Sequence, residues 1–284
     1  MVGRPVGGVG LSALLDRVAA HLRGAGRLGV AYSGGVDSAT LLAVAVRTLG
    51  ADRVVALLGV SPSLPAHERA AAHEVAADLG ATVVEVSTHE GDNPAYVANG
   101  PDRCFHCKDE LFTVISREVV ATHRLDAVAY GENADDALRP DRPGAQAATD
   151  HRVLRPLADA GLSKVDVRAL ARELGLGVAD KPAAPCLASR IPHGEPVTPA
   201  KLAQVEAAEG VLRACGFTDG RVRHHGDVAR LELPAAELAR AAEPDVAARL
   251  VAGVRAAGFR FVALDLAGIQ SGAFTLPLVD VTHG

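Results

Sequence analysis

A short glycine-rich segment between two apolar stretches has the residue types that bind phosphate. Residues 33–38 read Ser-Gly-Gly-Val-Asp-Ser, after the apolar run 28–32 and before the helical pattern 39–49. Two adjacent glycines let the backbone approach an anion and adopt dihedral angles that a β-carbon disfavours. The hydroxyls of Ser33 and Ser38 and the first N–H groups of the helix can donate to phosphate oxygens, where the helix dipole favours negative charge. The segment predicts a phosphate site, and a plain glycine turn is the alternative.

Asp37 differs from the rest of this loop because its carboxylate would repel a phosphate group. A cation between the two groups removes the repulsion, so the loop predicts Mg²⁺ beside Asp37. No Gly-Lys-Ser or Gly-Lys-Thr ends the segment, and it is therefore not a Walker loop. Asn133 follows the apolar run 127–130 and precedes Ala-Asp-Asp. Its amide is a candidate contact for ATP, the following carboxylates are candidate contacts for Mg²⁺, and helix capping is the alternative.

Three of the four cysteines are candidates for metal binding or sulfur chemistry. Cys104 and Cys107 form a CxxC pair at the start of a helical pattern, and Cys186 lies near the cations Lys181 and Arg190. Both settings favour the reactive thiolate. Three thiolates can hold three irons of a [4Fe–4S] cluster and leave one iron open for sulfide, or they can bind Zn²⁺ together with a histidine. A redox dithiol and inert cysteines are the alternatives, and Cys215 is expected to pack in the core.

Two arginines, Arg221 and Arg223, are two residues apart in the predicted strand 221–225. Side chains alternate along a strand, so both guanidinium groups lie on one face. Two adjacent guanidinium groups suit a phosphate or a carboxylate, because each can form bidentate hydrogen bonds. An exposed edge strand with solvated charges is the alternative. His224 and His225 are expected in a hairpin turn, with metal binding as the alternative role.

Apolar strands alternate with helical patterns over the first two thirds of the chain. The strands are expected at residues 28–32, 54–60, 82–86 and 127–130, and the helices at 9–24, 39–49, 66–79, 108–123 and 164–174. This alternation is typical of an α/β fold with a doubly wound parallel sheet, in which ligands bind beyond the carboxyl ends of the strands. A smaller α+β unit with its own helices and strands follows from about residue 198. We therefore expect two domains, residues 1–190 and 191–284.

The composition argues against several classes of function. The net charge is −5 and the sequence has no long basic block, which argues against a nucleic acid as the partner. No apolar stretch approaches the ~20 residues that a membrane span needs. The N-terminal residues do not resemble a secretion signal, so we expect a cytoplasmic protein whose cysteines are not bridged. We also expect a homo-oligomer that binds a small molecule.

Several separate stretches resemble the LarE-type sulfurtransferases, a family within the ATP pyrophosphatase (PP-loop) superfamily. Members of that superfamily cleave ATP between the α and β phosphates. The LarE-type enzymes make the pyridinium-3,5-bisthiocarboxylic acid mononucleotide of the nickel-pincer cofactor. The matching stretches include residues 31–38, 103–108, 142–144, 160–164, 180–182, 186–192 and 221–227.

The resemblance implies that the chain adenylates a carboxylate of a pyridinium biscarboxylate mononucleotide and converts it to a thiocarboxylate, with release of AMP and pyrophosphate. It implies Cys186 as the sulfur centre, with Asp37 and Ser38 as the other catalytic residues. It also implies a [4Fe–4S] cluster on Cys104, Cys107 and Cys186. The implied nucleotide contacts are Ala31, Ser33, Gly34, Gly35, Asp37, Ser38 and Asn133, and the implied substrate contacts are Arg190, Arg221 and Arg223.

The chain departs from the family pattern at two single positions, and the segment 152–156 fits the pattern imperfectly. Gln270 stands where the family usually has arginine, and Glu132 stands where a threonine is usual. A relative that thiolates a different carboxylate is therefore one alternative. The others are a PP-loop tRNA thiolase, an amide-forming enzyme like NAD or GMP synthetase, and a non-catalytic nucleotide sensor.

Overall fold

The computed structural model describes residues 10–138 and 143–270. Its contacts divide the chain into two compact units. The first consists of Met1–Glu90 and Cys104–Ala184, and the second of Gly91–Arg103 and Pro185–Gly284. The longer segment of the second unit thus begins at Pro185, six residues before the expected start at residue 191, and the unit also includes the earlier segment Gly91–Arg103. The division into two domains after residue 190 stays a prediction.

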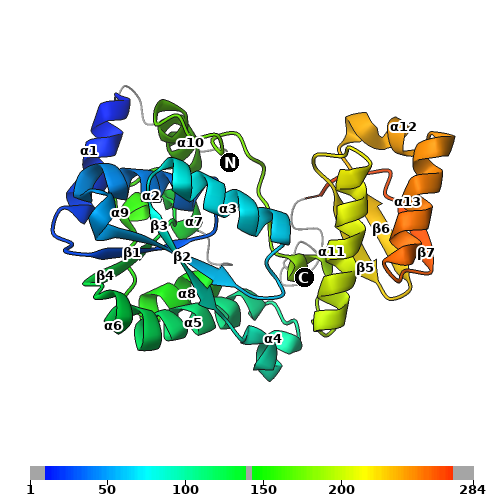
Figure 1. Ribbon diagram of the computed structural model, residues 1–284, viewed down its shortest axis with the longest axis horizontal. Coiled ribbons are helices and arrows are strands. Elements are labelled where there is room, and N and C mark those ends of the chain that lie inside the picture. The colour runs from blue at the N-terminus through cyan, green and yellow to red at the C-terminus, as the bar shows by residue number, and fades with distance from the viewer. Residues whose placement is uncertain (1–9, 139–142, 271–284) are drawn as a thin grey trace, which may run out of the picture. The chain divides into compact units, whose positions relative to one another are not determined.

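A four-stranded parallel sheet forms the centre of the first unit (Figure 1). The strands lie in the order β3-β2-β1-β4, and Val30 of β1 lies opposite Ala56 of β2 and Ala129 of β4. Strands β1 and β2 are apolar along their length because helices cover both faces of a parallel sheet. The α/β prediction is confirmed. The bounds of the strands are β1 (Leu28–Tyr32), β2 (Val54–Val60), β3 (Thr82–Ser87) and β4 (Ala127–Tyr130).

Helices cover the two faces of this sheet and form two apolar clusters (Figure 1). Alternate residues of β2 point to opposite faces, so that Ala56 belongs to one cluster and Leu57 to the other. The helices of the first face are α1 (Leu11–Leu22), α2 (Val36–Leu49), α3 (Ala66–Asp78), α9 (Pro156–Asp159) and α10 (Lys164–Glu173). Those of the second face are α5 (Arg103–Val114), α6 (Val120–His123) and α8 (Pro143–Asp150).

The predicted helix 108–123 differs from the observed one in two respects. Helix α5 begins at Arg103, so both cysteines of the CxxC pair lie in its first turns. A π-helical turn, Ile115–Val119, then separates α5 from α6. Residues 143–144 belong to α8, and residues 139–142 lie outside the described residues. The short elements η1 (Ala51–Arg53), η2 (Glu90–Asp92) and α7 (Ala134–Ala137) complete this part of the chain.

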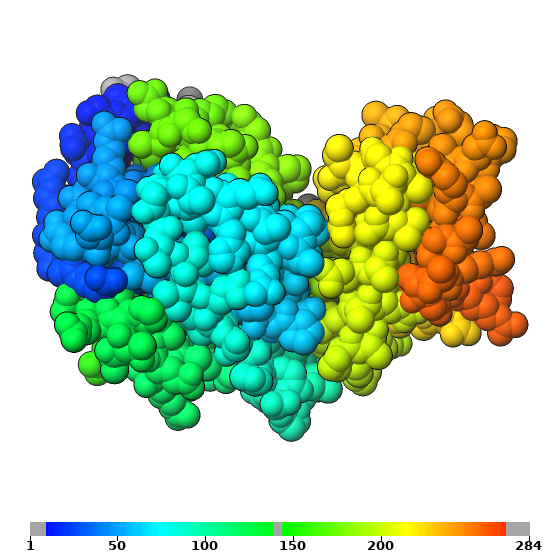
Figure 2. All heavy atoms as spheres, viewed as in Figure 1, coloured from blue at the N-terminus to red at the C-terminus, as the bar shows by residue number. Residues whose placement is uncertain are grey.

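The second unit has a separate core on a three-stranded mixed sheet, β5-β6-β7. Strand β6 pairs antiparallel with β5 and parallel with β7. Cys215 is buried in this core, as expected. Residues of α11 and α13 (yellow and orange) cover the face of the unit that Figure 2 shows. The elements are α4 (Pro94–Val97), η4 (Leu187–Arg190), α11 (Pro199–Ala214), β5 (Arg221–His225), β6 (Val228–Glu232), η5 (Ala235–Glu237), α12 (Leu238–Ala241), α13 (Pro244–Ala256) and β7 (Phe261–Leu264).

No helix within residues 10–138 and 143–270 is long and apolar enough to cross a membrane.

Helix α10 begins with a reciprocal cap between Ser163 and Asp166. The hydroxyl of Ser163 accepts a hydrogen bond from the N–H of Asp166 at 3.2 Å, and the Asp166 carboxylate accepts one from the N–H of Ser163 at 3.0 Å. Two N–H groups that a helix start leaves without partners are thereby satisfied. The cap also fixes the position of Lys164, the first residue of the helix.

We expect Ser163→Ala to lower the free energy of unfolding by about 1 kcal/mol, because the capping acceptor is lost. The matched variant Ser163→Gly is expected to cost only about 0.3 kcal/mol, since glycine is tolerated at this position. Equilibrium unfolding in urea measures both values. Equal losses in the two variants would contradict the role of the cap.

Candidate functional site

The loop between β1 and α2 requires glycine at its second position. Gly34 has a φ of +71°, in the left-handed region that glycine favours. A β-carbon there would lie 2.9 Å from the Cβ atom of Ala72 in α3. Gly34 is therefore needed both for its backbone conformation and for the close approach of α3 to the loop.

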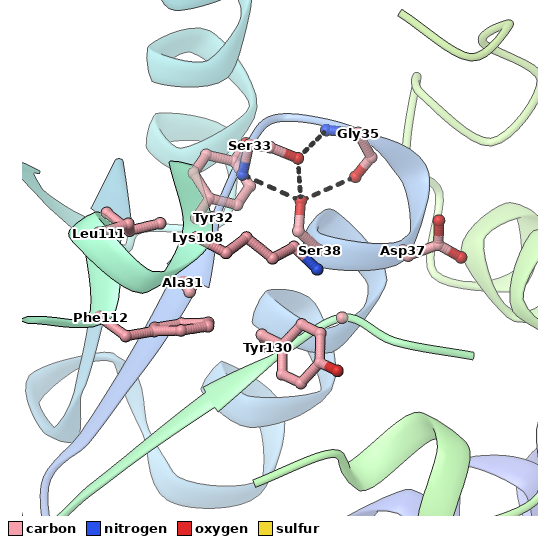
Figure 3. Close-up of a pocket in the computed structure, with 11 residues that line it drawn as sticks. Ala31, Tyr32, Ser33, Gly35, Asp37, Ser38, Lys108, Leu111, Phe112 and Tyr130 are labelled. Atoms are coloured by element: carbon pink, nitrogen blue, oxygen red, sulfur yellow. Dashed lines mark hydrogen bonds between the residues drawn. The ribbon is translucent and has the colours of Figure 1, made fainter. Parts of the chain in front are cut away.

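Hydrogen bonds within the loop fix its two hydroxyl groups (Figure 3). The N–H of Ser33 donates to Ser38 Oγ at 3.2 Å, and Ser38 Oγ donates to the carbonyl of Gly35 at 3.1 Å. The two serine hydroxyl oxygens are 3.2 Å apart. Gly35 is the N-cap residue of α2, and the first N–H groups of a helix have no partner within it. The loop thus presents hydroxyl and N–H groups together, as an anion requires.

A second glycine, which the sequence analysis did not identify, holds the start of α2 from the other side. Gly131 follows β4, and a β-carbon there would lie 2.7 Å from the backbone nitrogen of Ser38. The obstructing atoms are backbone atoms, which cannot move aside as a flexible side chain can. The position of Gly131 directly after a strand that faces the loop was the available signal.

A pocket of about 210 Å³ opens beside the loop (Figure 3). One wall is apolar and includes Phe112 and Tyr130, whose ring centroids are 6.0 Å apart. The ammonium group of Lys108 lies 4.8 Å from the centre of the Tyr130 ring. An apolar wall beside hydroxyl, N–H and ammonium groups suits a nucleotide. The lining residues are Ala31, Tyr32, Ser33, Gly35, Asp37, Ser38, Lys108, Leu111, Phe112, Tyr130 and Gly131.

Asp37 contacts an amide and an ammonium group. The amide nitrogen of Asn133 donates to Asp37 Oδ1 at 3.1 Å, and the ammonium group of Lys164 binds Asp37 Oδ2. Asn133 also caps α7, because its Oδ1 accepts a hydrogen bond from the N–H of Asp136 at 3.0 Å. Both interpretations of Asn133, as a helix cap and as a neighbour of the phosphate loop, are therefore compatible. Its contact with ATP stays a prediction.

Lys164 is the cation that the structure places beside Asp37, where the sequence predicted only Mg²⁺. The main-chain N–H of Lys164 donates to the carboxylate of Asp135 at 2.8 Å. Lys164 therefore contacts the carboxylates of both Asp37 and Asp135. Mg²⁺ binds proteins through one or two carboxylates and takes its other ligands from phosphates and water. Asp37 fits that requirement. In the described part of the chain, no group of three or more His, Cys, Asp or Glu side chains is placed to hold a metal ion.

The three candidate cysteines are divided between the two units, with Cys104 and Cys107 in the first and Cys186 in the second. Cys104 is exposed and Cys107 is half-buried in the first turns of α5, and residues three apart on a helix share a face. Cys186 is half-buried and precedes η4, and its carbonyl accepts hydrogen bonds from the N–H and the hydroxyl of Ser189 at 3.0 and 2.7 Å. Thiolates suit iron–sulfur clusters and zinc. The cluster on these three cysteines stays a prediction.

The arginines of β5 are buried, so the interpretation of an exposed strand with solvated charges is wrong. Only 5% of Arg221 and 3% of Arg223 is exposed. Arg223 pairs with the buried carboxylate of Glu232 at 2.8 Å. Arg223 and Arg221 also donate to the main-chain carbonyl of Gln270 at 3.0 and 3.3 Å. Because this contact uses the backbone, it does not depend on the side chain at position 270.

Each guanidinium nitrogen of Arg190 has a hydrogen-bond partner within the second unit. Its guanidinium group binds the carboxylate of Glu209 at 2.8 and 3.3 Å, and both side chains are buried. It also donates to the carbonyl of Pro185 at 2.8 Å and to the hydroxyl of Ser189 at 2.9 Å. These contacts surround Cys186 and favour a positioning role for Arg190. Its contact with a substrate stays a prediction.

Positive charges lie close together in this part of the second unit. Burial chiefly, and then the charges of Arg190 and Arg223, lower the pKa of Arg221. A bound anion would relieve the repulsion among the three groups. The buried arginines are therefore suited to an anionic ligand such as a phosphate group.

The two histidines belong to the end of β5, and the expected turn is formed by Gly226 and Asp227. His224 is buried, its Nε2 lies 3.1 Å from Gln204 Oε1, and burial lowers its pKa. Its ring also packs against Phe259 at a centroid distance of 5.2 Å. These contacts explain His224 as a packed core histidine.

Comparison with known proteins identifies the relatives of this chain. Residues 11–129 match the asparagine synthase family. The chain is 42% identical over 243 residues to an uncharacterized protein of Synechocystis sp., which covers 86% of this chain and 90% of that protein. It is 36% identical over 253 residues to the pyridinium-3,5-bisthiocarboxylic acid mononucleotide synthase of Lactiplantibacillus plantarum. The aligned residues cover 89% of this chain and 90% of that protein. An uncharacterized protein of Methanocaldococcus jannaschii is 27% identical over 206 residues.

We expect Gly131→Ala to lower the free energy of unfolding by about 1–3 kcal/mol, because the added methyl group overlaps the backbone of Ser38. Gly177→Ala is the matched control, since nothing lies within 4 Å of the added atom and the backbone conformation is ordinary. The control is expected to be neutral or to stabilise by about 0.4–1 kcal/mol. Urea unfolding measures both variants, and an equally stable Gly131→Ala protein would contradict the close contact.

Proposed function

The chain belongs to the family of LarE-type sulfurtransferases, and we propose that it converts a carboxylate of a pyridinium biscarboxylate mononucleotide to a thiocarboxylate in an ATP-dependent reaction. The observation that carries the proposal is the 36% identity to the Lactiplantibacillus plantarum synthase over 89% of this chain. The preformed phosphate loop and the pocket beside it support the use of ATP.

The first half-reaction activates the substrate. The substrate carboxylate attacks the α-phosphorus of ATP, pyrophosphate leaves, and an acyl-adenylate forms. When the nucleotide binds, the hydroxyls of Ser33 and Ser38 turn from their contacts within the loop and donate to the phosphates together with the first N–H groups of α2. Ala31, Gly34 and Gly35 leave room for the nucleotide. Mg²⁺ beside Asp37 would neutralise phosphate charge.

Lys164 contributes to the same step. Its ammonium group binds Asp37 beside the phosphate loop, and the cap of α10 fixes the backbone from which the side chain extends. A fixed cation at this place offsets the charge that develops on the leaving pyrophosphate, without reorganisation during the reaction.

The second half-reaction transfers sulfur. Sulfur from Cys186, or sulfide supplied beside it, attacks the acyl carbon, a C–S bond forms, and the C–O bond to AMP breaks as AMP leaves with the electron pair. Where Cys186 itself is the nucleophile, its Cβ–Sγ bond then breaks with loss of the Cα proton, which releases the thiocarboxylate and leaves dehydroalanine. Cys104, Cys107 and Cys186 would hold the [4Fe–4S] cluster, which when bound would supply sulfide at its open iron. Zn²⁺ is the alternative occupant. Arg221 and Arg223 bind the substrate phosphate, for which their burial and mutual repulsion are the supporting observations.

Analysis of iron and acid-labile sulfide in the anaerobically purified protein tests the cluster against zinc. The substrate, offered with ATP and Mg²⁺, tests the reaction through its two products, AMP and the thiocarboxylate. The homo-oligomer, the cytoplasmic location and the absence of a nucleic-acid partner stay predictions.

We expect Lys164→Met to lower the rate of pyrophosphate release by about 10²–10³-fold, because a preorganised charge at the phosphates is removed. Lys181→Met is the matched control in the same unit, since Lys181 pairs with Glu68 at 2.6 Å. A coupled pyrophosphate assay compares the two. If both variants lose activity to the same degree, Lys164 has no specific role in the step.

We expect Cys186→Ala to retain substrate-dependent pyrophosphate release and to form no thiocarboxylate, because activation does not use the thiol. Cys215→Ala removes a buried packing cysteine and is expected to retain both activities. Mass spectrometry of the products after anaerobic incubation gives the result. Thiocarboxylate formation by Cys186→Ala at the wild-type rate would rule out Cys186 as the sulfur centre.

A further inference from the structure

The loop around Cys186 depends on a segment that lies far away in the sequence. Residues 185–197 contain only the short helix η4, so many of their backbone groups have no partner in regular secondary structure. Buried backbone groups of this kind must be satisfied from elsewhere. The segment 91–103, which belongs to the same unit, supplies the partners.

Asn99 is the centre of these contacts. It is fully buried and has a φ of +58°, a left-handed conformation that asparagine tolerates better than most residues. Its side-chain nitrogen donates to the carbonyls of Ile191, Pro192 and Glu195 at 3.3, 2.8 and 2.9 Å. One amide group therefore binds three carbonyl oxygens of the loop.

The loop also donates hydrogen bonds to main-chain carbonyls of the segment 91–103. The carbonyl of Asn99 accepts the N–H of Gly194 at 3.2 Å and lies 3.0 Å from Nδ1 of His193. The N–H of Val197 donates to the carbonyl of Val97 at 2.9 Å. The loop is thus held through both its donors and its acceptors.

Arg103 extends this network to the neighbourhood of Cys186. Its guanidinium group is buried and donates to the carbonyl of Ala188 at 3.0 Å and to the side-chain oxygen of Asn99. Ala188 lies two residues after Cys186. Arg103 therefore connects the Asn99 contacts to the backbone that carries the thiol.

We propose that Asn99 and Arg103 are positioning residues that hold the Cys186 loop in the geometry needed for sulfur transfer. The inference rests on the proposed function only in assigning the sulfur step to Cys186. Neither residue lines the pocket beside the phosphate loop. Their loss affects the second half-reaction and leaves the first intact.

The first variant is Asn99→Gly, which keeps the left-handed backbone accessible and removes only the amide group. We expect the rate of thiocarboxylate formation to fall at least about tenfold, because near-ångström displacement of a reacting group has effects of this size. Substrate-dependent pyrophosphate release and the KM for ATP are expected to stay within about twofold of the wild type.

Asn99→Asp tests the donor itself. Aspartate keeps the shape and the acceptor for Arg103 but directs a carboxylate oxygen at three carbonyls. We expect the same loss of thiocarboxylate formation as in Asn99→Gly. The control is Arg124→Gly, at an exposed left-handed position in the first unit, which is expected to retain both half-reactions.

A pair of variants at Arg103 supplies a rescue. Arg103→Met removes all donors, and we expect its rate of thiocarboxylate formation to fall about tenfold. Arg103→Lys keeps a cationic donor, and its rate is expected to lie between those of Arg103→Met and the wild type. This pair carries the test if the variants of Asn99 do not accumulate as folded protein.

Hydrogen exchange read by mass spectrometry gives a measurement that does not need activity. The peptide containing Gly194 and Val197 is expected to exchange at least tenfold faster in Asn99→Gly, while the peptide containing residues 33–49 is unchanged.

The inference is overturned if Asn99→Gly and Asn99→Asp form thiocarboxylate and exchange their loop amides at wild-type rates. It is also overturned if pyrophosphate release falls as much as thiocarboxylate formation. If the wild type forms no thiocarboxylate, the proposed function fails, and hydrogen exchange alone then decides whether Asn99 holds the loop.

Discussion

The start of helix α2 is held by two contacts that leave no room for a side chain, and the geometry of the phosphate loop depends on them. Gly34 lies against Ala72 of α3, and Gly131 lies against the backbone of Ser38. Because protein interiors are close-packed and transmit strain, the helix start cannot shift without disturbing its neighbours. The same turn carries Asp37, whose carboxylate meets Asn133 and Lys164. One backbone arrangement therefore fixes the hydroxyls, the N–H groups and the paired charge.

The second unit keeps guanidinium groups away from water. Arg190 and Arg223 each bind a buried glutamate, and each also donates to a main-chain carbonyl, that of Pro185 and that of Ser189 respectively. Breaking such a pair leaves a buried charge uncompensated, which costs far more than the pair itself contributes to stability. These pairs are therefore better explained by the fixed positions that they give to charges than by their effect on stability. A fixed arrangement of cations suits an anionic substrate.

Much of the fold and part of the site were predictable because their signals are local. The apolar strands, the glycine-rich loop and the CxxC pair at a helix start each lie within a few consecutive residues. The pairing of Asp37 with Lys164 joins residues 127 apart, and no periodicity reveals such a contact. The burial of Arg221 and Arg223 was missed for a related reason. The groups that cover Arg223, the carbonyls of Ser189 and Gln270, come from distant segments without a regular pattern.

The chain supplies Asn99 long before it supplies the carbonyls that Asn99 binds, since Asn99 and Ile191 are 92 residues apart. Ribosomes add roughly 5–20 residues per second, so residues 91–103 wait on the order of 5–20 s for their partners. During that interval the amide of Asn99 and the guanidinium group of Arg103 remain hydrated. The second unit can close only after its own later stretch has been synthesised. Its folding therefore waits for the synthesis of residues 185–197, although its segment 91–103 is made about 90 residues earlier.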